Sequence, residues 1–208
     1  MNGVFITLEG VEGCGKTTQM TLLGQRLEAE GRRVLRTREP GGTPIAETIR
    51  GILLDPANTA LCPVAELLLY EAARAQHVAE RIQPALEAGT IVLCDRFADS
   101  TTAYQGAGRV LPRDTVLNLH RVATGGVWPD LTIVFDVPVA MGLERAAAVG
   151  HRDRIECEPL EFHERVRAEF LRIAEAEPER VKVVDAAQPP EAVAEVVYEL
   201  VRAIVGQP

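Results

Sequence analysis

The chain has 208 residues, of which 47% are apolar and 25% are charged, so it is long enough to bury a sizeable core. Its net charge of −8 excludes the strongly basic surface typical of proteins that bind nucleic acids or membrane surfaces. The four cysteines show no C-x-x-C pair and no metal-ligand spacing, which predicts reduced thiols in a cytoplasmic protein. The sequence has no apolar run long enough to span a bilayer, so we expect neither nucleic acid nor a membrane as partner.

Short apolar stretches alternate with helical patterns along the chain. Strands are predicted at residues 4–8, 33–37, 90–94, 131–137 and 181–184. Helices are predicted between Thr18 and Gly31, after the N-cap Thr43, from Pro63 to Gly89 with a kink at Pro84, and over 115–123, 139–148, 160–176 and from Pro190 onward. This alternation predicts an α/β protein in three layers, a five-stranded parallel sheet with helices on both faces.

Apolar residues at helical spacing predict which helix faces form the core. The predicted core faces are Ile45, Ile49, Ile52 and Leu53 of the second helix, Phe162, Val166, Phe170 and Ile173 of the helix over 160–176, and Val193, Val196, Val197, Leu200, Val201 and Ile204 of the last helix. In such a sheet, ligands collect at the carboxyl ends of the strands. Three polar clusters fall there, directly after the first, second and third predicted strands.

The first of these clusters has the pattern G-x-x-x-x-G-K-T between a predicted strand and a predicted helix, which is typical of a phosphate-binding P-loop. Its glycines let the backbone approach phosphate oxygens, and the N–H groups at the helix N-terminus point toward them. Lys16 would reach the β- and γ-phosphates of a nucleotide, and Thr17 would hold Mg²⁺ through its hydroxyl. The predicted nucleotide-binding residues are Gly10, Val11, Glu12, Gly13, Cys14, Gly15, Lys16, Thr17 and Thr18.

The other two clusters carry opposite charges at the ends of strands. Asp95 and Arg96 end the third predicted strand, where a carboxylate can orient Mg²⁺, usually through water, and an arginine can bind phosphate. An ordinary ion pair at the strand end is the alternative. Residues 38–42, R-E-P-G-G, place a cation and an anion in one short loop, which also fits a plain turn with a solvated ion pair.

Two further segments have side chains suited to a base or a sugar. Tyr70 and Arg74 are four residues apart on a predicted helix, where the ring could stack on a base and the guanidinium could bind a phosphate. A core tyrosine with a surface arginine is the alternative. Residues 100–106 are rich in hydroxyl and amide groups, which suit a sugar or base edge and also a capped helix start. The histidines show no ligand spacing and are expected to be ordinary surface or core residues: His77, His120, His151 and His163.

A dense run of charge interrupts the helical pattern near residues 149–157, as a mobile lid would. The arginines in and beside this run are Arg145, Arg152 and Arg154. Such arginines could close over a γ-phosphate and stabilise the charge that develops during transfer. A solvated run of charges is the alternative interpretation.

Together these segments resemble the bacterial thymidylate kinases. The matching segments are residues 9–18, 37–43, 72–74, 95–96, 100–106, 129–131, 153–156 and 185–186, in family order over nearly the whole chain. The R-E-P-G-G and A-Y-Q-G segments are far more specific than the P-loop. The resemblance implies one thymidylate-kinase-like domain over residues 1–208 with a P-loop NTPase fold and a short lid at about 149–157. It also implies phosphorylation of dTMP to dTDP with ATP and Mg²⁺ in dTTP synthesis, and a homodimer.

The resemblance also implies roles for individual residues. Glu12 would meet the 3′-hydroxyl of dTMP, Arg50 and Arg96 its phosphate, and Arg74 the thymine edge. Tyr70 would stack on the base, and Tyr104 would lie where a ribose 2′-hydroxyl would sit. The full substrate-binding set is Glu12, Glu39, Pro40, Arg50, Tyr70, Arg74, Arg96, Ser100, Tyr104 and Gln105. The catalytic set is Lys16, Arg96, Arg145, Arg152 and Arg154, and the metal-binding residues are Thr17 and Asp95.

Two departures from the family pattern carry consequences. Tyr70 stands where the family usually has phenylalanine, so base preference could shift. Cys14 stands where a small inert residue is usual; a thiol at a helix N-terminus tends toward reactivity, and we expect ATP to protect it from alkylation.

Three other functions fit parts of the pattern. A kinase of another nucleoside monophosphate would differ at Tyr70, Arg74, Tyr104 and Gln105. A guanine-nucleotide switch would usually carry N-K-x-D, which this sequence lacks. A structural role with vestigial nucleotide binding conflicts with the presence of Lys16, Thr17 and Asp95.

Overall fold

The computed structural model describes residues 3–148, 150 and 153–206. Within these residues, five strands form one sheet in the order β2-β3-β1-β4-β5, and every neighbouring pair is parallel. The strands are β1 (Val4–Glu9), β2 (Val34–Arg38), β3 (Ile91–Asp95), β4 (Leu131–Asp136) and β5 (Val181–Asp185). The predicted α/β class and parallel sheet are therefore confirmed, and the predicted strand ends agree to within one residue.

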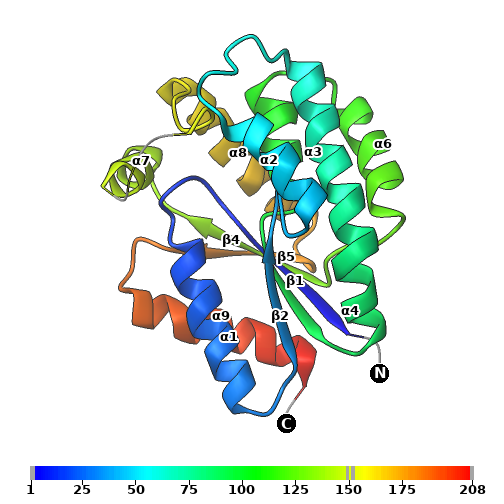
Figure 1. Cartoon of the computed structure of the whole chain (residues 1–208). Helices are drawn as coiled ribbons and strands as arrows, with labels where there is room; N and C mark the ends of the chain where they lie inside the picture. Colours follow the sequence, from blue (N-terminus) through cyan, green and yellow to red (C-terminus); the bar gives the residue numbers. More distant parts are fainter. Residues whose placement is uncertain (1–2, 149, 151–152, 207–208) are drawn as a thin grey trace.

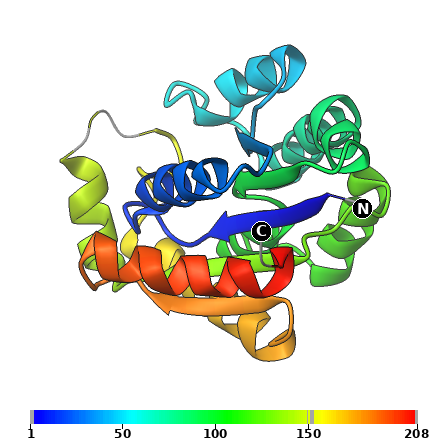
Figure 2. The same cartoon turned by 90° about the horizontal axis from the view of Figure 1, so that it is seen from below.

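Helices cover both faces of the sheet. They are α1 (Lys16–Ala29), α2 (Pro44–Leu54), α3 (Pro63–His77), η1 (Val78–Ile82), α4 (Gln83–Glu87), α5 (Ala98–Thr101), η2 (Thr102–Gly108), α6 (Arg113–Thr124), α7 (Val139–Ala147), α8 (Leu160–Ala176) and α9 (Pro190–Val205). Figures 1 and 2 show α1 and α9 side by side on one face, whereas α3, α6 and α8 lie on the other side of the sheet. None of the described helices is both long and apolar enough to cross a membrane.

The long helix that begins at Pro63 changes its geometry before Pro84. α3 continues into η1, a π-helical segment, and then into α4, which has Pro84 in its first turn. Proline lacks an N–H and its ring clashes with the carbonyl four residues earlier, so the regular hydrogen-bond ladder cannot pass through it. The disturbance expected at Pro84 therefore takes the form of a π-helical turn directly ahead of it.

Helix packing confirms some of the predicted core faces and contradicts others. Phe162, Val166, Phe170 and Ile173 of α8 are all buried, as predicted. Ile45 and Ile52 of α2 are exposed, because α2 packs mainly against α3 and buries the face with Ala46 and Leu53. In α9 the buried row is Val193, Val197 and Val201, four residues apart, so the predicted burial of Val196 and Ile204 beside it is wrong.

The local signals around α2 behave as predicted. Thr43 is the N-cap, with its Oγ1 accepting a hydrogen bond from the Ala46 N–H at 3.4 Å, and Pro44 occupies the first turn. Residues 100–106, in contrast, lie within the helical segments α5 and η2. This winding turns successive hydroxyl and amide side chains toward different partners, which the linear sequence could not indicate.

Candidate active site

Two cavities open at the carboxyl ends of the strands, on either side of the P-loop. The first, of about 230 Å³, lies among the P-loop, α2, α3, η2 and the ends of β2 and β3. The second, of about 710 Å³, lies among the P-loop, α7 and residues 186–193. Gly13, Lys16, Thr17 and Glu156 line both cavities. Two ligands could therefore bring reacting groups together beside Lys16 and Thr17.

The P-loop has the geometry that its glycines predict. Gly13 has a φ of 65°, and a Cβ there would lie 2.0 Å from the Gly142 carbonyl oxygen of α7, so no larger residue fits. The Lys16 ammonium donates to the carbonyls of Gly10 at 3.2 Å and Val11 at 3.0 Å, and lies 3.3 Å from the Cys14 Sγ. Of the predicted nucleotide-binding residues, those that line the second cavity are Gly13, Cys14, Gly15, Lys16, Thr17 and Thr18.

Every predicted substrate-binding residue lines the first cavity. The structure brings together Glu12, Glu39, Pro40, Arg50, Tyr70, Arg74, Arg96, Ser100, Tyr104 and Gln105. They come from the P-loop, the loop after β2, α2, α3, the end of β3, α5 and η2. The parallel sheet explains this convergence, because the carboxyl ends of its strands lie on one edge.

Arg96 turns back toward the P-loop immediately after β3. Its φ of 70° is left-handed, a conformation that costs a non-glycine residue about 1–3 kcal/mol. Its guanidinium donates to the Gly10 carbonyl at 2.8 Å and to Glu12 Oε1 at 3.1 Å, and lies 4.9 Å from the centre of the Tyr104 ring. The strained backbone thus places a cation at the junction of the P-loop and the first cavity.

Glu12 is the carboxylate at the centre of this junction. The Tyr104 hydroxyl donates to its Oε1 at 2.6 Å, and the His163 Nδ1 lies 3.2 Å from its Oε2. Although burial opposes ionisation, the contacts with His163, Arg96 and Tyr104 hold the pKa of Glu12 at about 2. Glu12 is therefore an anion at neutral pH and can only accept hydrogen bonds.

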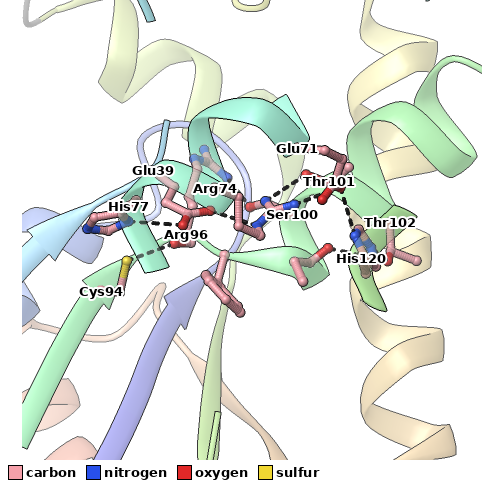
Figure 3. A network of polar contacts seen from close by, with 12 residues as sticks. Glu39, Glu71, Arg74, His77, Cys94, Arg96, Ser100, Thr101, Thr102 and His120 are labelled. Carbon is pink, nitrogen blue, oxygen red and sulfur yellow. Dashed lines mark hydrogen bonds and ion pairs between the residues drawn. The ribbon is translucent and has the colours of Figure 1, made fainter. Parts of the chain in front are cut away.

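Arg74 is buried, so the alternative interpretation of Arg74 as a surface arginine beside a core tyrosine is wrong. It donates to Glu39 Oε2 at 2.8 Å, Glu71 Oε1 at 2.7 Å and Thr101 Oγ1 at 2.9 Å, as Figure 3 shows. Tyr70, one turn earlier on α3, lines the same cavity, and burial raises the pKa of its hydroxyl. The guanidinium is held in place on three sides, and it still borders the cavity.

Thr17 and Asp95 both border the first cavity, as expected for residues that could hold a metal ion. Asp95 ends β3, and its Oδ1 is buried without a hydrogen-bond partner among the described residues. A buried, unpaired carboxylate oxygen and a hydroxyl that border the same cavity suit a hard cation such as Mg²⁺, which prefers oxygen ligands and retains several waters. The donor set therefore fits Mg²⁺.

The predicted lid arginines lie in different places. Arg145 of α7 lines the second cavity and donates to the Ala186 carbonyl at 3.3 Å. Arg154 borders neither of these two cavities: it is buried, donates to the Leu53 carbonyl at 2.8 Å and pairs with Glu66. Arg152 lies outside the described residues. The neighbours of Arg154 in sequence, Asp153, Ile155 and Glu156, border the first cavity.

Three residues outside the predicted substrate-binding set also line the first cavity: Arg38, Phe97 and Thr101. Arg38 and Thr101 belong to the predicted segments 38–42 and 100–106, whereas Phe97 was not expected from the sequence. The histidines were expected to be surface or core residues, and the three described ones are buried. Each also lies beside a buried carboxylate: His77 by Glu39, His120 by Glu71 and His163 by Glu12. His151 lies outside the described residues. The spacing of Glu71, Arg74 and His77 on one helix face could have signalled part of this network. His120 and His163 have no comparable local signal.

Comparisons with known proteins agree with this arrangement. The thymidylate kinase family model matches residues 8–197. A thymidylate kinase from Geobacter sulfurreducens is 55% identical over 204 residues, covering 95% of this chain and 96% of the relative. One from Thermomicrobium roseum is 56% identical over 97% of this chain and 95% of the relative. One from Pseudomonas fluorescens is 55% identical over 91% and 90%. With this match over nearly its whole length, the chain belongs to the thymidylate kinase family.

Proposed function

We propose that this protein transfers the γ-phosphoryl group of ATP to the phosphate of dTMP, giving ADP and dTDP for dTTP synthesis. The observation that carries the proposal is the meeting of two cavities at Lys16 and Thr17, in a chain of the thymidylate kinase family. The first cavity would hold dTMP and the second ATP, with their phosphates adjacent at the P-loop.

The first cavity offers complementary groups for each part of dTMP. Tyr70 would stack on the thymine, and Arg74 would donate to its edge. Glu12, an obligate acceptor, would take a hydrogen bond from the 3′-hydroxyl. Arg50 and Arg96 would bind the phosphate. The remaining predicted contacts, which would shape the nucleoside site, are Glu39, Pro40, Ser100, Tyr104 and Gln105.

The second cavity and the P-loop would hold ATP. The loop N–H groups and the N-terminus of α1 would bind its phosphates, while Lys16 would exchange the loop carbonyls for phosphate oxygens. Thr17 and Asp95 would hold Mg²⁺, which in this role neutralises phosphate charge and orients the oxygens.

Transfer between two polyanions needs positioning and charge neutralisation more than a general base, because the attacking phosphate oxygen is already anionic. That oxygen attacks the γ-phosphorus, the bond from the γ-phosphorus to the β–γ bridging oxygen breaks, and ADP leaves with the electron pair. Lys16 and Arg96 would neutralise the charge, together with Arg152 and Arg154 of the lid at about 149–157 and Arg145 beside it.

We also propose a cytoplasmic homodimer, with residues 1–208 as a single domain. Exposed apolar side chains on the neighbouring helices α2 and α3 support self-association: Ile45, Ile52, Val64 and Leu68. Light scattering on Leu68→Glu should give a monomer. The control Ile204→Glu, on the exposed side of α9, should leave the oligomeric state unchanged.

The test of function is ADP formation from ATP and Mg²⁺ with dTMP, dUMP, dCMP, dGMP, AMP or UMP as acceptor. We expect strong preference for dTMP, and no activity in Lys16→Ala. Preference for another monophosphate would refute base recognition by Tyr70 and Arg74. Slow ATP hydrolysis that needs no acceptor would instead favour a nucleotide switch.

A further inference from the structure

Two buried histidines lie behind the arginine proposed to read the base. A guanidinium has five N–H donors, and three of those on Arg74 are engaged by Glu39, Glu71 and Thr101. The direction of the remaining donors, on a side chain that borders the first cavity, is therefore set by the two carboxylates.

Each of these carboxylates is held in turn by an imidazole, as Figure 3 shows. The His77 Nδ1 lies 3.0 Å from Glu39 Oε1, and the His120 Nδ1 lies 2.8 Å from Glu71 Oε1. A carboxylate only accepts, so Nδ1 carries the proton in both rings. The other nitrogen of each ring meets a hydroxyl: the Nε2 of His77 lies 2.7 Å from Thr37, and that of His120 3.0 Å from Thr102.

The network has the same order on both sides of Arg74, from threonine to histidine to glutamate. Its members come from β2 and the following loop, α3, η2 and α6, so it ties four parts of the fold to one guanidinium. Neither His77 nor His120 lines the first or second cavity, and both are buried. They can act on a substrate only through Glu39, Glu71 and Arg74.

We propose that His77 and His120 are positioning residues that set the base preference of the enzyme. By fixing both carboxylates, they hold the donors of Arg74 where they meet the carbonyl oxygen at position 4 of thymine. Cytosine carries an amino group in place of that oxygen at position 4, so two donors would face each other there. This inference rests on the proposed function, since it assumes that dTMP occupies the first cavity.

Paired substitutions distinguish the contact made by Nδ1 of each histidine from the contact made by Nε2. Asparagine places an amide nitrogen near the position of Nδ1, whereas glutamine reaches the position of Nε2. We expect His77→Asn and His120→Asn to keep the kcat/KM ratio of dTMP over dCMP within about threefold of the wild type. We expect His77→Gln and His120→Gln to lower this ratio by about tenfold or more, through a higher KM for dTMP with the KM for ATP unchanged.

The matched control is His163→Gln, because His163 is also buried against a carboxylate, Glu12, but does not contact the Arg74 network. Its dTMP over dCMP ratio should stay at the wild-type value. The ratio of dTMP over dUMP should also stay constant in every variant, since both bases present the same oxygen.

Equal ratios in the asparagine and glutamine variants would overturn the proposal, as would a loss of thermal stability with the ratio unchanged. If a glutamine variant does not fold, His77→Leu and His120→Leu replace it, since leucine also lacks a donor at the position of Nδ1; an unchanged ratio in both would equally overturn the proposal. A wild-type protein that phosphorylates neither dTMP nor dCMP would instead refute the proposed function, so the two failures are distinguishable.

Discussion

Arg154 and Glu66 form a buried ion pair, with the Arg154 Nη1 2.6 Å from Glu66 Oε2. Glu66 also accepts from Arg109 and from Gln105, a predicted substrate contact of the first cavity. Arg154, the proposed lid cation, is therefore linked to Gln105 of the substrate cavity through the Glu66 carboxylate. To reach the phosphates, Arg154 would have to leave Glu66, which would retain Arg109 and Gln105 as partners.

This relationship makes Arg154→Ala informative. We expect kcat to fall by about 10³-fold, as for other arginines that stabilise phosphoryl transfer, with a much smaller effect on dTMP affinity. Arg109→Ala is the control, because it also breaks a contact with Glu66 but has no proposed role at the phosphates; it should reduce stability and leave kcat near the wild type. A large loss of dTMP affinity with unchanged kcat in Arg154→Ala would count against the lid role.

The unpaired Oδ1 of Asp95 leads to a prediction about metal dependence. EDTA should abolish activity, and Asp95→Asn should raise the Mg²⁺ concentration for half-maximal rate by about tenfold or more, since an amide oxygen attracts a hydrated cation less than a carboxylate does. Asp114→Asn, at an exposed position on α6, is the control. An unchanged Mg²⁺ requirement in Asp95→Asn would refute the assignment.

The hydrogen bond from Tyr104 to Glu12 leads to a prediction about sugar selectivity. Tyr104→Phe removes a hydroxyl from the place where a ribose 2′-hydroxyl would sit, so the kcat/KM ratio of dUMP over UMP should fall by about tenfold. Tyr198→Phe is the matched control, since Tyr198 donates to Glu30 at the same distance of 2.6 Å, far from the site in the α1–α9 pair. A ratio that does not change in Tyr104→Phe would place the sugar elsewhere.

Glu9, at the end of β1, leads to a prediction about stability and pH. Burial, reinforced by the nearby Asp99, raises its pKa from 4.5 to about 8, so it is protonated in the folded protein at neutral pH and ionised in the unfolded chain. Between these values unfolding releases a proton, and raising the pH therefore lowers the free energy of unfolding, by about 1.4 kcal/mol per pH unit from this group. Glu9→Gln should remove that slope.

Urea denaturation between about pH 5.5 and pH 7.5 measures the effect as the difference between Glu9→Gln and the wild type, which should grow with pH. Glu12→Gln is the contrast, because the pKa of Glu12 is held at about 2: its carboxylate loses its contribution only below about pH 4.5. A constant difference for Glu9→Gln over this range would contradict the prediction.

Cys14 is buried in the P-loop and borders the second cavity, where ATP is proposed to bind. Alkylation by iodoacetamide should therefore be slower than at the exposed Cys62, and saturating ATP should slow it further. Mass spectrometry of each cysteine measures both rates in one sample, with the buried Cys94 as a thiol that borders neither cavity. Equal labelling rates of Cys14 with and without ATP would contradict the prediction.

The sequence alone was sufficient to predict the P-loop, the N-cap at Thr43, the five strands and the gathering of polar segments at one edge of the sheet. Each of these depends on a spacing of a few residues or on the geometry common to all parallel sheets. The sequence also identified ten residues that line the first cavity, the whole predicted substrate-binding set, because their motifs resemble those of a family.

Only the tertiary structure decided how those residues are supported. The Tyr104–Glu12 hydrogen bond joins residues 92 positions apart, and His163 reaches the same carboxylate from α8. Likewise the exposure of Ile45 and Ile52 depends on the packing of α2 against α3 and not on their spacing. Local patterns specify which side chains share a face. A buried charge is stable only with a partner, and which residue becomes that partner depends on how distant elements pack together.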